Sequence, residues 1–73
     1  MTSDFTPDHS EPYITLTDFL KYHNLVGSGG EAKMVIQDGH VQVNGEVESR
    51  RRRKLHAGDI VVFMDEEMTV AID

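Results

Sequence analysis

Four arginines followed by a lysine form the densest group of functional side chains in this sequence, where residues 49–55 read SRRRRKL. Arginine presents a planar fork of N–H donors that matches the oxygens of a phosphate group. Adjacent cations also occur on ordinary solvated surfaces. Phosphate binding is favoured here because the acidic ends of the chain already supply solubility. The candidate residues in this run are Arg50, Arg51, Arg52, Arg53 and Lys54.

A second candidate anion site is the sequence GSGGEAK at residues 27–33. Ser28 followed three residues later by Glu31 is a capping-box pattern, which predicts the start of a helix. The first N–H groups of a helix have no partner within the helix, and glycines leave them accessible to an anion. The same glycines are also typical of a flexible joint, and the spacing is not that of a nucleotide-binding P-loop. The candidate residues are Ser28, Gly29, Gly30 and Lys33.

The net charge of −6 hides an uneven distribution along the chain. Residues 1–20 and 59–73 contain nine acidic residues and neither lysine nor arginine. Residues 21–58 contain all seven lysines and arginines, against four acidic residues. Because salt screens charges beyond about 10 Å at 0.1 M, an approaching phosphate is affected more by this basic segment than by the distant acids. The acidic composition therefore does not exclude a polyanionic partner.

Several functional classes lack the residues that they need. The chain has no cysteine, which fits a cytoplasmic location, and its longest apolar stretch, residues 60–64, is too short to cross a membrane. The N-terminus does not resemble a signal peptide. The four histidines are widely spaced, and no nucleophile–base pair or cofactor-binding loop can be assembled. We therefore expect a binding protein rather than an enzyme, with no cofactor and no metal.

Two short helices are predicted to position the candidate residues. Residues 1–12 have two prolines and no apolar periodicity, so we expect a disordered or loosely attached tail before a domain at residues 13–73. Apolar residues spaced i, i+3, i+4 predict one helix from Leu16 to residue 23 or 24 and another over residues 29–38. Thr15 or Thr17 caps the first helix, Ser28 caps the second, and Gly39 ends it.

After the second helix the apolar period changes to two, which predicts antiparallel strands. Val41 and Val43 alternate with polar residues, and Asn44-Gly45 predicts a hairpin turn. A flat strand through residues 50–54 would bury some of its cations, so we expect an exposed, irregular connection there. Further strands are predicted at residues 60–64 and 68–72, with an acidic turn between them. This order predicts an α+β fold in which two short helices, helix-turn-helix-like, pack on a small antiparallel sheet.

These motifs together resemble the S4 RNA-binding domain, named after a small-subunit ribosomal protein, in its stand-alone bacterial form of the YaaA and YbcJ type. They occur in order and without a gap over nearly the whole chain after the tail. The motifs are Leu16 with Phe19-Leu20, then Ser28, Ala32, Ile36 and Gly39, the VQVNG sequence at residues 41–45, and Gly58-Asp59 before an apolar strand.

The resemblance implies the helix-turn-helix arrangement of that family, the αL motif, and binding of structured RNA, usually ribosomal or transfer RNA. In the family, the start of the second helix and the basic segment after the VNG turn line the RNA-facing groove. These regions correspond here to Ser28, Gly29, Gly30 and Lys33 and to Arg50–Lys54. The family often has arginine where this chain has Thr15 and Gly29.

The expected partner is therefore structured RNA or the ribosome, with a monomeric protein and no membrane association. None of the five aromatic residues interleaves with the arginines, which favours recognition of RNA backbone and shape over base stacking. An alternative stays open, namely a protein-interaction module that docks a charged partner, for example on the ribosome.

Overall fold

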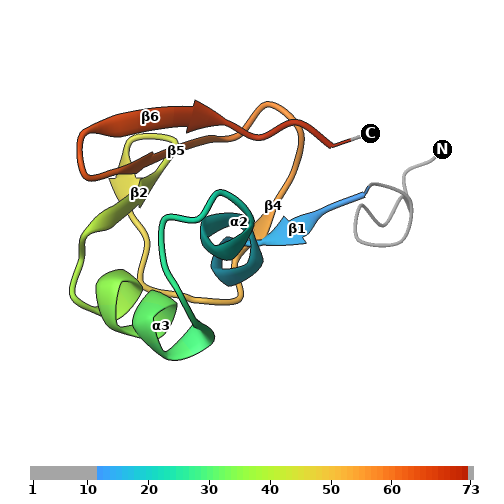
Figure 1. Cartoon of the computed structure of the whole chain (residues 1–73). Helices are drawn as coiled ribbons and strands as arrows, with labels where there is room; N and C mark the ends of the chain where they lie inside the picture. Colours follow the sequence, from blue (N-terminus) through green and yellow to red (C-terminus); the bar gives the residue numbers. More distant parts are fainter. Residues whose placement is uncertain (1–11, 73) are drawn as a thin grey trace, which may run out of the picture.

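A computed structural model describes residues 12–72 and confirms the predicted α+β class. Helices α2 (Leu16–Tyr22) and α3 (Gly29–Gln37) pack beneath a four-stranded antiparallel sheet, and a two-stranded sheet lies beside α2 (Figure 1). The predicted tail lies, apart from Pro12, outside the described residues. Neither of the two helices in the described part of the chain is long and apolar enough to span a bilayer.

Both helices begin at the predicted caps. The Thr15 hydroxyl accepts a hydrogen bond from the N–H of Asp18 at 3.2 Å, and the Ser28 hydroxyl accepts one from the N–H of Glu31 at 3.2 Å. Gly39, just after α3, has φ +84°, a left-handed conformation that favours glycine and ends the helix. The buried side chains of the two helices are Leu16, Phe19, Leu20, Ala32 and Ile36.

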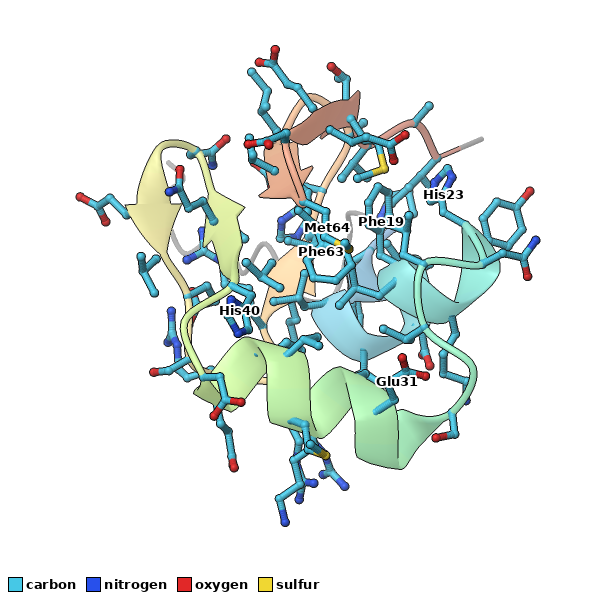
Figure 2. All side chains as sticks on the ribbon, turned by 60° about the vertical axis from the view of Figure 1, so that its left-hand side comes forward. Phe19, His23, Glu31, His40, Phe63 and Met64 are labelled. Carbon is cyan, nitrogen blue, oxygen red and sulfur yellow. The ribbon has the colours of Figure 1, made fainter. Side chains whose placement is uncertain are left out.

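The larger sheet has the strand order β3-β2-β5-β6. Its strands are β2 (Val41–Val43), β3 (Glu46–Val47), β5 (Ile60–Phe63) and β6 (Glu66–Thr69). Val41 and Val43 are buried while Gln42 is exposed, which confirms the predicted alternation. The Asn44-Gly45 turn joins β2 to β3, with φ +53° and +88° at the two residues. Figure 2 shows Phe63 directed from β5 towards the helices, where the hydrophobic core of the described residues lies.

The β5–β6 hairpin turns earlier than predicted. Met64 and Asp65 form the turn with φ +53° and +65°, so Glu66 and Glu67 belong to β6 rather than to an acidic turn. Two-residue turns with positive φ match the twist of antiparallel strands, which lets pairing resume at once. The acidic residues therefore lie on an edge strand of the sheet, since β6 has only one neighbour.

The smaller sheet pairs two segments that are far apart in the sequence. Strand β1 (Ile14–Thr15) is antiparallel to β4 (Lys54–Leu55), with Thr15 opposite Lys54. Lys54 therefore lies in a strand, whereas an irregular connection was predicted through this residue. Residues 50–53 lie outside the strands, as predicted. This pairing places the end of the arginine run beside the start of α2.

Candidate nucleic-acid interface

The arginine run is folded into a tight turn. The N–H of Arg53 donates to the carbonyl oxygen of Arg50 at 3.2 Å, which closes a turn with Arg51 and Arg52 at its tip. An i to i+3 hydrogen bond of this kind is typical of a β-turn, and the two central residues, Arg51 and Arg52, are exposed. The run therefore consists of two flanking arginines and two arginines at the tip.

Glu48 binds both flanking arginines. Its side chain is buried, with a relative exposure of 7% for the residue. One carboxylate oxygen accepts hydrogen bonds from the backbone N–H and from Nε of Arg50, both at 2.9 Å. The other accepts from Nη2 of Arg50 at 3.2 Å and from Nη1 of Arg53 at 2.8 Å. Glu48 therefore holds both ends of the turn.

These hydrogen bonds also set the charge of Glu48. The side chain of Arg50, more than any other group, lowers the pKa of Glu48 from 4.5 to about 2, and the Arg50 N–H and Arg53 act in the same direction against the effect of burial. The same pair raises the pKa of Arg50. Glu48 is consequently a carboxylate at neutral pH, and it neutralises part of the positive charge of its two partners.

The start of α2 binds the other side of the turn. The N–H of Leu16 donates to the carbonyl oxygen of Arg53 at 2.8 Å. The carbonyl oxygen of Arg51 accepts both the N–H of Thr17, at 3.1 Å, and the Thr17 hydroxyl, at 2.8 Å. The first N–H groups of a helix need partners from outside it, and here the arginine turn supplies them. The turn is thus fixed by tertiary hydrogen bonds on two sides.

A hollow of about 570 Å³ opens between this turn and the starts of both helices. It brings Arg51, Arg52 and Lys54 together with Gly29, the first residue of α3. Asp18 is the one acidic residue in its lining. The other lining residues are Tyr13, Thr15 and Thr17. The hollow therefore combines cationic side chains with the first turn of a helix, both of which attract anions.

The other predicted residues of α3 contribute less. The hydroxyl of Ser28 is used as the helix cap, and Glu31 accepts a hydrogen bond from the N–H of Gly27 at 2.8 Å, which places a carboxylate at this helix start. A nearby carboxylate opposes an anion at the same place. Gly30 and Lys33 are exposed, but neither is among the residues that line the hollow.

Sequence reasoning missed two residues of this site, Glu48 and Tyr13. An acid two residues before the run was a visible sign of an ion pair, but its burial was not visible. Tyr13 reaches the hollow through the β1–β4 pairing, and the Lys54 ammonium lies 5.0 Å from the centroid of its ring. The aromatic residues do not interleave with the arginines in the sequence, but the fold brings Tyr13 to the hollow that Arg51 and Arg52 line.

Two of the histidines among the described residues, His40 and His56, do not line the basic hollow. His40 lines a different hollow with Met64, and the Nε2 atom of His56 is buried. Within residues 12–72, no three histidine or acidic side chains are grouped in a way that could hold a metal ion.

The fold and the basic hollow define a small α+β domain that presents cations beside a helix pair, and its sequence is similar to those of known proteins. The match to the S4 domain family covers residues 8–71. The chain belongs to the S4 domain family, which confirms the resemblance inferred from its motifs.

Two curated relatives are similar over most of their length. "Putative RNA-binding protein YbcJ" of Escherichia coli (strain K12) is 41% identical over 59 residues, covering 81% of this chain and 84% of the relative. "Probable ribosome maturation protein RlbA" of Bacillus subtilis (strain 168) is 48% identical over 48 residues, covering 66% of this chain and 68% of the relative.

Proposed function

We propose that this S4 domain protein binds structured RNA through backbone phosphates, with Arg51 and Arg52 as the principal contacts. The observation that carries the proposal is the convergence of Arg51, Arg52 and Lys54 with the start of α3 on one hollow. The name of the Escherichia coli relative, which includes RNA binding, supports it.

The ion pairs divide the arginine run by role. Arg50 and Arg53 are bound to Glu48, so they shape the turn and offer less charge to a ligand. Arg51 and Arg52 have no carboxylate partner among residues 12–72. A guanidinium without a partner is better placed to bind phosphate oxygens, because no existing ion pair has to be broken first.

We further propose that the RNA is ribosomal, with transfer RNA as the other structured candidate. The support is the name of the Bacillus subtilis relative, which includes ribosome maturation. We also propose that the protein is a monomer, that it acts in the cytoplasm, and that it binds RNA without catalysing a reaction.

The test is a titration of a ribosomal RNA hairpin at several salt concentrations. Each neutralised phosphate contributes about 0.7 to 0.9 to the slope of log K against log salt. Replacing Arg51 and Arg52 by alanine should weaken binding and make the slope shallower by about 1.4 to 1.8. Arg50→Ala should change the slope less than Arg51→Ala does. Lys21→Ala, which removes a cation at the far end of α2, is the control and should leave the slope unchanged.

Two results would count against the proposal. Equal slopes for wild type and the double variant would show that the tip arginines do not contact phosphate. Little RNA binding by the wild type even at low salt would favour the alternative, in which the arginines dock an acidic protein. Lys33→Ala tests the α3 residues in the same assay, and a slope change near one unit would add Lys33 to the interface.

A further inference from the structure

Tyr13 separates the basic hollow from a second hollow that the proposed function does not use. The second hollow has a volume of about 380 Å³ and lies between the end of α2 and the segment after β6. Tyr13 lines both hollows, so the two share one wall. The two hollows are therefore adjacent.

The lining of the second hollow contains no lysine, arginine, aspartate or glutamate. Its residues are Tyr13, Ile14, Phe19, Tyr22, His23, Val70, Ala71 and Ile72. Tyr13 is 45% exposed and Tyr22 is 77% exposed, so both rings offer accessible aromatic surface. Among the described residues, aromatic surface is thus gathered directly beside the cationic hollow.

Three of the rings along this wall, those of Phe19, Tyr22 and His23, are packed against one another. Phe19 and His23 lie next to each other at the end of α2, with ring centroids 4.4 Å apart (Figure 2). Tyr22 meets His23 edge-on at 5.2 Å. These contacts limit the rotation of the rings, so a flat ligand that stacks on them loses little further side-chain entropy.

A nucleotide combines the two chemistries that the adjacent hollows offer. Its phosphate is anionic, and its base is a flat, uncharged ring system that stacks on aromatic side chains. Proteins recognise RNA sequence mainly at loops and bulges, where bases are unstacked and accessible. We propose that the second hollow holds one unpaired base of the bound RNA, stacked on Tyr13 or Tyr22, while its neighbouring phosphate lies at Arg51 and Arg52.

This inference rests on the proposed function, and it selects RNA that carries an unpaired nucleotide. The experiment compares two hairpins of the same stem, one fully paired and one with a single bulged 2-aminopurine, whose fluorescence reports stacking. Wild type should bind the bulged hairpin at least about fivefold more tightly, the lower end of what one base–aromatic stack contributes, and should quench the probe.

The variants separate stacking from phosphate binding. Tyr22→Ala should reduce the preference for the bulge and leave binding of the paired hairpin and its salt slope unchanged. Tyr13→Ala should also reduce the preference, and because Tyr13 lines the basic hollow, its bulge affinity is compared with the affinity of the same variant for the paired hairpin. Tyr13→Phe should retain the preference, because the ring is kept. The matched control is Met34→Ala, which removes an exposed apolar side chain of α3 that does not line the second hollow. Circular dichroism confirms that each variant is folded.

The outcomes distinguish the two proposals. Equal affinity of wild type for both hairpins, with a steep salt slope, would overturn the base site and leave the phosphate-binding function standing. A bulge preference that survives in both tyrosine variants would place the base elsewhere and also overturn the site. Absence of binding to either hairpin would contradict the proposed function itself.

Discussion

The arginine turn at residues 50–53 and the β5–β6 hairpin are both closed by two-residue tips, yet they are held in different ways. In the hairpin, Val61 and Phe63 are buried in the core, and a ladder of backbone pairs runs along both strands. The arginine turn has no buried apolar side chain, and its fixed points are the Glu48 carboxylate and the start of α2.

The difference shows how a small domain can position charged residues without using buried apolar side chains to hold them. Burying an arginine in the apolar core would be costly, so an exposed cationic loop cannot be anchored by packing. Hydrogen bonds to one buried carboxylate and to unpaired helix N–H groups fix the backbone instead. The tip arginines are consequently held at a defined place while their side chains face solvent.

The largest expected effect is on the apolar anchor of the hairpin. Phe63→Ala should lower the free energy of unfolding by about 3 to 5 kcal/mol, because it leaves a cavity in the core. That is a large part of the total stability of a domain of this size. Glu67→Gln, an exposed change in the same hairpin, should stay within about 0.5 kcal/mol. Urea unfolding of both variants measures this, and a small loss for Phe63→Ala would mean that the hairpin does not depend on the core.

Glu48, which holds the arginine turn, should contribute less to the free energy of unfolding than Phe63 does. Glu48→Gln removes the charge at nearly constant size and should cost about 1.5 to 3 kcal/mol, the usual contribution of hydrogen bonds to charged groups. Glu46→Gln, two residues earlier and exposed, is the matched control and should have little effect. Thermal unfolding compares the two. Equal melting temperatures would show that Glu48 does not hold the turn.

The same anchor should weaken in acid. Because the pKa of Glu48 is lowered from 4.5 to about 2 in the folded protein, its contribution to stability is complete above pH 4.5 and is lost as the pH falls towards 2. The difference in melting temperature between wild type and Glu48→Gln should therefore shrink over this interval. Parallel curves from pH 6 to pH 2 would contradict the low pKa.

The helices and most strands could be predicted from sequence because their causes are local. Ser28 and Gly39 mark the two ends of α3, and the spacing of Ala32 and Ile36 gives its buried face. The arrangement of the site was not predictable in this way. The hydrogen bond of Leu16 to Arg53 joins residues far apart in the sequence, and nothing in either segment alone specifies the partner.

The sequence predicted that the arginine run as a whole binds phosphate, but it did not predict which arginine has which role. A run of five cations does not show which of them face a carboxylate, because that depends on the direction in which the chain turns. The approach of Tyr13 to Lys54 likewise follows from the pairing of β1 with β4. Two features of the site therefore depend on tertiary contacts. One is which arginines bind a carboxylate, and the other is the approach of an aromatic ring to the cations.

The smallest expected effect on the free energy of unfolding comes from glycine substitutions, one in each of the two tips. Asp65 has φ +65°, a conformation that costs most residues energy and glycine almost none, so Asp65→Gly should raise the free energy of unfolding by about 0.5 to 1 kcal/mol. Arg52 is not among the described residues with positive φ, so Arg52→Gly should instead lower it by about 0.5 to 1 kcal/mol through the greater freedom of the unfolded chain. Arg52→Ala removes the same charge without that freedom, and urea unfolding of the three variants separates the two effects. We expect the conformation of the hairpin tip to depend on local backbone preference and that of the arginine tip on tertiary contacts. If both glycine substitutions changed the free energy of unfolding in the same direction, this expectation would be contradicted.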